Sequence, residues 1–186
     1  MIQLGLVIEI IAVALVAVLM PVGFSVWWQL IPMAAYGLGL GFASAQLTSV
    51  VLSEVPIMQS GEGSATQSTV RQLGTAVGSA ISGASLAMAV NGTLPARLES
   101  LGLPAKVGDG LAQAVSGSAG GVIGAFRSGD GPAARFGDEA PKIADAMTSG
   151  FIEGGQWTLL VAGTMLFIGL LASAAVRRAA LSHNVR

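Results

Sequence analysis

The sequence predicts an all-α, polytopic membrane protein, a helical bundle with four transmembrane helices and one long polar loop before the last of them. Two observations lead to this fold class. Of the 186 residues, 53% are hydrophobic and only 10% are charged, whereas soluble domains carry about 25% charged residues. Four stretches also contain roughly 20 mostly apolar residues each, the length that a helix needs to cross a bilayer. A surface so poor in charge requires lipid as its solvent.

The first two expected spans follow each other closely. The first transmembrane helix is expected at residues 1–20 and is followed by Pro21. A cleaved signal peptide is the alternative for this stretch, but no Lys or Arg precedes the apolar run and Glu9 interrupts it. The chain also begins almost inside this span, as a fragment of a longer membrane protein would. The second helix is expected at residues 28–53, before Pro56.

The last two expected spans are separated by the long loop. The third helix is expected at residues 64–90, because Ser64–Gln67 fits a capping box, in which the first and fourth side chains cap the helix start. Residues 91–156 form the loop, which is rich in Gly, Ala and Ser and contains four prolines. The fourth helix is expected at residues 157–176, and residues 177–186 form a basic tail.

The orientation follows from tryptophans and arginines. Tryptophan favours the membrane interface, and if the spans alternate, all three tryptophans share one side: Trp27, Trp28 and Trp157. Four arginines near the spans share the other side: Arg71, Arg177, Arg178 and Arg186. The loop carries five basic residues of its own, but a loop this long can translocate regardless of charge. We therefore expect an extracytoplasmic loop and cytoplasmic termini.

Three polar residues of the expected spans are candidates for a functional role. Glu9 and Gln46 are nearest to the middle of the membrane, where a carboxylate is costly and marks a functional hypothesis. Glu9 is either a proton-binding residue or a residue near the membrane face. Gln46 either contacts a substrate or hydrogen-bonds to a neighbouring helix. Arg71 lies about 10 Å into its helix at 1.5 Å per residue, so it either snorkels to the interface or pairs with Glu54 or Glu62.

Small residues recur every fourth position in the second and third spans. Such spacing places them on one helix face and lets two helices approach closely in lipid. The face serves either packing alone or a sliding movement during transport. These residues are Gly37, Gly41 and Ala45 in the second span, and Gly74, Gly78 and Ser82 in the third.

The remaining sequence argues against several functional classes. The chain has no cysteine and one histidine, His183 in the tail, so we expect no disulfide, thiolate chemistry or metal site. We find no phosphate loop, nucleophile elbow or cofactor motif, and therefore expect neither an enzyme nor a cofactor. The net charge of −1 gives no reason to expect nucleic acid. In the loop, the stretch from Gly110 to Phe126 can form short amphipathic helices, and Gly117–Gly121 reads as a linker.

Four runs together resemble one family. They are the glycine-rich run from Gly37 to Phe42, the pair Val55-Pro56, the run from Gly61 to Thr66, and the run from Val70 to Ile81, which contains Arg-Gln-Leu-Gly. They resemble the C-terminal part of the fourteen-helix drug:proton antiporters of the major facilitator superfamily. The resemblance makes the four spans the last four of fourteen, so the fold would be a C-terminal fragment of a major facilitator fold.

The resemblance implies a function in transmembrane transport. The chain would be part of a proton-coupled efflux transporter for multiple drugs or small molecules, in a bacterial plasma membrane. Its partners would be the lipid bilayer, protons, a small hydrophobic or cationic drug-like substrate, and the missing N-terminal helices. The family's proton-coupling acids lie in that missing part, so their roles cannot be assigned here. The alternative is a stand-alone four-helix membrane protein with a structural or assembly role.

The resemblance also implies roles for residues. The second span would line the substrate cavity, which makes Gln46 and Tyr36 candidate cavity residues. The first span would face lipid, which leaves Glu9 a weak candidate for a proton site, and Arg71 would lie at the cytoplasmic interface. The small residues that would serve helix packing or gating are Gly37, Gly41, Gly74, Gly78 and Ser82.

Overall fold

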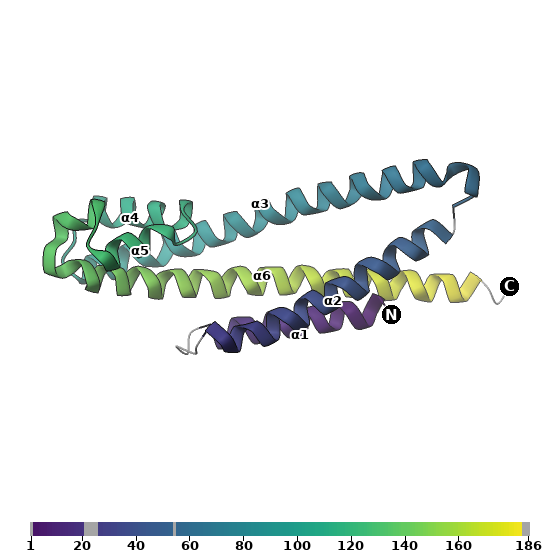
Figure 1. Ribbon diagram of the computed structural model, residues 1–186, viewed down its shortest axis with the longest axis horizontal. Helices are drawn as coiled ribbons and strands as arrows, with labels where there is room; N and C mark the ends of the chain where they lie inside the picture. Colours follow the sequence, from purple (N-terminus) through teal and green to yellow (C-terminus); the bar gives the residue numbers. More distant parts are fainter. Residues whose placement is uncertain (1, 21–25, 54, 184–186) are drawn as a thin grey trace. The chain divides into compact units, whose positions relative to one another are not determined.

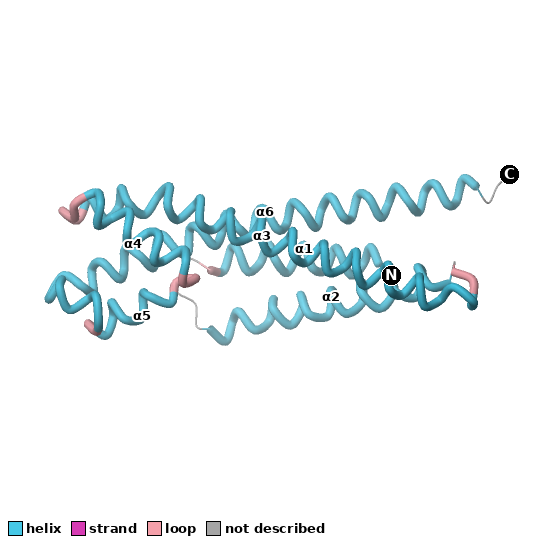
Figure 2. The backbone as a smooth tube through the Cα atoms, turned by 90° about the horizontal axis from the view of Figure 1, so that it is seen from above, coloured by secondary structure: helices cyan, strands magenta, loops and turns pink. Residues whose placement is uncertain are grey.

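The computed structural model describes residues 2–20, 26–53 and 55–183, with side chains for residues 2–20, 27–50 and 55–176. This part of the chain is helical and contains no strand (Figures 1 and 2). The elements in order are α1 (Ile2–Leu19), α2 (Val26–Ser53), the 3₁₀ turn η1 (Ile57–Gln59), α3 (Ser60–Ser100), α4 (Ala105–Gly117), α5 (Gly121–Ser128), the 3₁₀ segment η2 (Gly131–Glu139) and α6 (Ala140–His183).

Four of these helices, α1, α2, α3 and α6, are long and apolar enough to cross a membrane. The predicted all-α class with four helices of this kind is therefore confirmed. The chain divides into two compact units, which are described separately. One unit comprises Met1–Ala80 and Leu159–Arg186, and the other comprises Ile81–Thr158.

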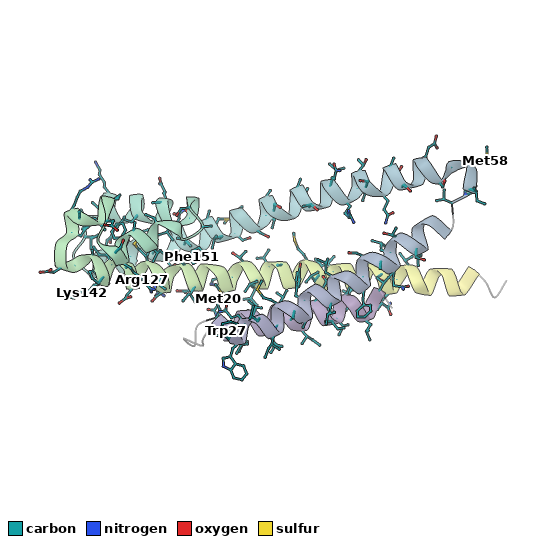
Figure 3. The ribbon with its side chains drawn as sticks, in the orientation of Figure 1. Met20, Trp27, Met58, Arg127, Lys142 and Phe151 are labelled. Carbon is teal, nitrogen blue, oxygen red and sulfur yellow. The ribbon has the colours of Figure 1, made fainter. Side chains whose placement is uncertain are left out.

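The first unit is built around a close pair of helices, α1 and α2, which run side by side (Figure 1). Most of the large apolar side chains on these helices are exposed, as lipid-facing residues are in a membrane protein. Trp27, in the first turn of α2, is 76% exposed and projects away from the helix (Figure 3). An indole in this position suits the membrane interface.

Helix α3 begins one turn earlier than the sequence indicates. The expected capping box starts at Ser64, but η1 leads directly into α3 at Ser60. The Ser60 hydroxyl donates a hydrogen bond to the carbonyl oxygen of Ile57 at 2.9 Å. In the 3₁₀ turn after Pro56, the backbone N–H groups of Gln59 and Ser60 already bond to the carbonyl oxygens of Pro56 and Ile57, so the helix does not need the later cap.

The second unit has a hydrophobic core formed by α3, α4, α5, η2 and α6. Three side chains on one face of α3, at intervals of four residues, are fully buried: Val90, Leu94 and Leu98. Two glycines on α6 allow their close approach, since a Cβ added at Gly150 would lie 3.1 Å from Leu94 and one at Gly154 only 2.7 Å from Val90. This contact holds α3 helical through Asn91-Gly92, where the expected span ends.

The expected loop of residues 91–156 is therefore mostly helical. As predicted, its middle forms short helices, α4 and α5, and the expected linker Gly117–Gly121 contains the turn between them. Gly120 has φ of +83°, a conformation that glycine adopts without strain. Phe151 covers this turn, and Arg127 donates a hydrogen bond to Thr148 at 3.3 Å (Figure 3). The α6 helix then begins at Ala140, well before the expected span at residue 157.

Candidate functional site

The closest contact between α1 and α2 is made by two glycines. A Cβ added at Gly39 would lie 2.8 Å from the carbonyl oxygen of Gly5, and one added at Gly5 would lie 2.8 Å from the backbone nitrogen of Ala43. Both distances are too short for a real side chain, so only glycine permits this approach. Backbones that meet this closely gain dispersion energy, which replaces the hydrophobic effect in lipid.

Glu9 lies one turn after Gly5 and is packed into the same contact. Its side chain is 3% exposed. A Cβ added at Gly39 would lie 2.9 Å from the Cγ atom of Glu9 and 3.0 Å from its backbone nitrogen. Its Oε1 atom is buried and accepts no hydrogen bond from any residue that the structure describes. Glu9 therefore faces a neighbouring helix, although the resemblance implied a peripheral, lipid-facing span.

A second polar site lies where α2 meets the first part of α3. The Gln67 amide donates a hydrogen bond to the Thr48 hydroxyl at 3.0 Å, and Thr48 donates in turn to the carbonyl oxygen of Ser44 at 3.1 Å. Next to this link is a pocket of about 220 Å³ lined only by polar residues: Thr48, Ser64, Gln67, Ser68 and Arg71.

Arg71 contributes the charge of this pocket. Its side chain is exposed, and in the described part of the chain no ion pair joins it to Glu62. Glu54, the other expected partner, lies outside the described residues. The side chains of Arg177, Arg178, His183 and Arg186 also lie outside the described part. Because α3 begins at Ser60, Arg71 lies about 16 Å along the helix at 1.5 Å per residue, deeper than expected, and its long side chain can extend back toward the helix start by snorkelling.

The two expected cavity residues are both exposed on α2. Tyr36 is 37% exposed, and Gln46 is exposed and makes no hydrogen bond within the described residues. Gln46 precedes Thr48 by two residues, which places it about 200° around the helix from the link to α3. The Gln46 side chain therefore faces away from α3 and takes no part in the hydrogen bonds that Thr48 makes with Gln67 and Ser44.

The small residues expected at a mutual contact are not brought together. A Cβ added at Gly37, Gly41, Gly74 or Gly78 would meet no atom within 4 Å among the described residues. Ser82 lies in the second unit and is half-buried. The close contact of α2 uses Gly39 instead, two residues from both Gly37 and Gly41 and hence on the opposite helix face. The glycine faces of α2 and α3 remain open.

An apolar pocket also occurs in the first unit. It has a volume of about 270 Å³ and lies between α1 and the part of α6 that belongs to this unit. Its lining contains no charged side chain, and Thr164 is its one hydroxyl residue. That hydroxyl donates to the carbonyl oxygen of Leu160 at 2.8 Å, so the pocket offers an almost wholly apolar surface, of the kind that a lipid chain covers.

Comparison with family models, curated proteins and solved structures finds no match. The site residues therefore rest on their own geometry. Sequence reasoning missed Gly5, Gly39 and Thr48. The pair Gly5 and Glu9, four residues apart on an apolar helix, was the available indication that one face of α1 packs against protein.

Proposed function

We propose that the chain supplies four transmembrane helices of a proton-coupled efflux transporter for drug-like small molecules in a bacterial plasma membrane. The proposal combines the resemblance of residues 37–81 to the drug:proton antiporters with one observation on the helices themselves. That observation is the open polar and glycine-rich surface of α2, on which Gln46, Gly37 and Gly41 are exposed.

The open surface of α2 supports a transporter for a physical reason. An amide exposed to hydrocarbon lacks hydrogen-bond partners, and an unpaired polar group of this kind costs about 2–7 kcal/mol by transfer measurements. A glycine face exposed to lipid likewise forgoes the close packing that such faces permit. Further helices or a water-filled cavity next to Gln46 remove both costs. Transporters place substrate sites in such a cavity, between helices of two halves.

The same open surface supports a second candidate function. The glycine faces of α2 and α3 also suit a helical partner in a stable assembly, in which the chain has a structural role and transports nothing. The two functions differ in what substitution of Gln46 changes. A cavity residue alters the handling of substrate, whereas an interface residue alters the recovery of the assembly.

An efflux assay tests the proposal. The longest open reading frame that contains these residues is expressed in an efflux-deficient bacterium, and accumulation of the fluorescent cation ethidium is followed with and without a protonophore. We expect lower accumulation, restored by the protonophore. Gln46→Ala should weaken efflux while the protein remains in the membrane at normal amount, and Ala45→Ser serves as the neighbouring control. Residues 1–186 expressed alone should not lower accumulation.

Two results would count against the transporter. Accumulation that is unchanged by the whole reading frame would favour the assembly function, especially if a second membrane protein is recovered with the chain. Efflux by residues 1–186 alone would show that four helices suffice and would contradict a role as part of a larger transporter.

A further inference from the structure

Glu9 is an ionisable side chain enclosed in a helix pair that is otherwise almost free of them. It is the eighth residue of α1, about 10 Å along the helix from its start at 1.5 Å per residue. It is the only acidic or basic residue of α1, and α2 has none. With 3% of its surface exposed, it lies deeper than any other charged-type side chain that the structure describes.

No cation among the described side chains of the surrounding elements compensates a charge on Glu9. Tyr36 on α2 is the one other titratable residue of the α1–α2 pair, and it is 37% exposed. The stretch of α6 that approaches α1 near Val13, Leu159–Val176, contains no titratable residue. Helix α3 carries Glu62 and Arg71, but Arg71 lies beside Thr48, nine residues and so about 13 Å along α2 from Gly39.

The close glycine contact decides which form of Glu9 fits. The Glu9 side chain packs against the α2 backbone at Gly39, and its Oε1 atom has no hydrogen-bond donor within the described part of the chain. A carboxylate there would be buried without a counter-ion or a donor, which costs several kcal/mol even after relaxation. A neutral carboxylic acid avoids most of that cost, because it carries no net charge.

We propose that Glu9 is a proton-binding site within the α1–α2 pair, and that binding and release of this proton close and open the pair. The closed pair holds the protonated acid. When the proton leaves, the carboxylate reaches water or lipid headgroups only if the backbones at Gly5 and Gly39 separate. The closed pair is therefore favoured at low pH and lost as the pH rises. This proposal does not rest on the transport function.

A hydrophobic carbodiimide tests the protonated state of Glu9 directly. Dicyclohexylcarbodiimide adds to a protonated carboxyl group: the acid oxygen bonds to the central carbon, the proton moves to a nitrogen, and nothing leaves. In nanodiscs, mass spectrometry should find Glu9 modified ahead of the exposed acids Glu99 and Glu139. Labelling should fall about tenfold per pH unit above the titration point. A water-soluble carbodiimide should show the opposite order, and Glu9→Gln should abolish the α1 adduct.

Spin labels test the opening of the pair. The chain has no cysteine, so Leu4→Cys and Leu40→Cys place two unique labels on exposed positions of α1 and α2. We expect one short label–label distance at an acidic pH value and a longer, broader distribution at an alkaline one. Glu9→Gln keeps the shape without the charge and should stay closed at both values.

Each outcome decides the proposal. Absence of Glu9 labelling at every pH would overturn the proton site. An unchanged distance in the parent protein, or an equal pH response in Glu9→Gln, would overturn the coupling to helix separation. Neither measurement depends on efflux, so this proposal and the proposed function can fail separately.

Discussion

The absence of one side chain, at Gly39, sets the distance between α1 and α2. A Cβ atom added at Gly39 would lie less than 3.0 Å from an atom of Gly5 and from an atom of Glu9. One of these atoms belongs to the Gly5 backbone, which cannot turn aside as a flexible side chain can. The backbones themselves would therefore have to move to admit even a methyl group.

We accordingly predict that Gly39→Ala weakens the α1–α2 contact by about 1–3 kcal/mol, the usual cost of overpacking. Gly37→Ala is the matched control, because a Cβ there meets nothing within 4 Å among the described residues and alanine is the better helix former. Thermal unfolding in detergent or nanodiscs, followed by circular dichroism, measures the difference. Equal melting temperatures for the two variants would contradict the close contact.

At the residue scale the sequence indicates that glycines pack helices but not which ones. Gly37, Gly39 and Gly41 follow one another at every second position, so they occupy two faces of α2. The four-residue spacing of Gly37 and Gly41 predicted a contact on the face that they share. In the structure, α1 packs against the opposite face, which contains Gly39. Periodicity describes one helix, and the choice of face depends on the partner helix, here on Gly5 of α1.

At the element scale, tertiary packing prevails over local helix-breaking residues. Asn91-Gly92 and Pro95 disfavour a helix interior, yet α3 continues to Ser100. Val90, Leu94 and Leu98 are spaced to form one buried stripe, and burying each such side chain contributes about 1.5–3 kcal/mol. That gain exceeds the propensity cost. The stripe was visible in the sequence, but its partner glycines on α6 lie more than fifty residues further along the chain.

The buried stripe leads to a prediction on the second unit. Leu94→Ala should destabilise it by about 2–5 kcal/mol, because the substitution removes buried methyl groups and leaves a cavity. Hydrogen exchange should accelerate in α4 and α5, which share this core with Leu94. Leu101→Ala, at a position that is 42% exposed, is the control and should change little. Equal exchange in the two variants would show that the core does not hold this unit together.

The ion pair between Arg97 of α3 and Glu153 of α6 should contribute far less than the apolar core. Its side chains are 43% and 36% exposed, and exposed ion pairs stabilise proteins by about 0–1 kcal/mol. A double-mutant cycle with Arg97→Ala and Glu153→Ala should therefore give a coupling energy within that range, smaller still at high salt. A coupling well above 1 kcal/mol, unaffected by salt, would mean that the pair is shielded from water.

For the whole molecule, composition and the length of the apolar stretches were enough to predict an all-α chain with four helices of membrane-spanning length. Low charge and four long apolar stretches leave few alternatives, and the four membrane-length helices follow from them. What composition cannot show is how far a helix extends beyond the hydrocarbon. Both α3 and α6 exceed 40 residues, whereas about 20 suffice to cross the bilayer. The additional turns of both helices carry apolar side chains that are buried in the core of the second unit. Their sequence pattern is neither the continuous apolar run of a span nor the polar pattern of a loop.

The orientation of the chain in the membrane is the last prediction, and it concerns all four spans at once. The three tryptophans fall on one side if the spans alternate, and Arg71 and the basic tail fall on the other. Because basic residues near span ends favour the cytoplasm, we expect both termini inside and residues 91–156 outside. Their compact core supports this placement, since a core sealed by apolar side chains is stable in water.

Reporter fusions measure this orientation. Alkaline phosphatase, which is active only outside the cytoplasm, should be active when fused after Met20 and Gly120 and inactive after Glu54 and Arg186. A fluorescent protein that matures only in the cytoplasm should give the reverse pattern, which controls for differences in expression. An active phosphatase after Arg186, or an inactive one after Gly120, would invert the topology. In that case the polar pocket at Arg71 would face the outside, and residues 91–156 would have to fold in the cytoplasm.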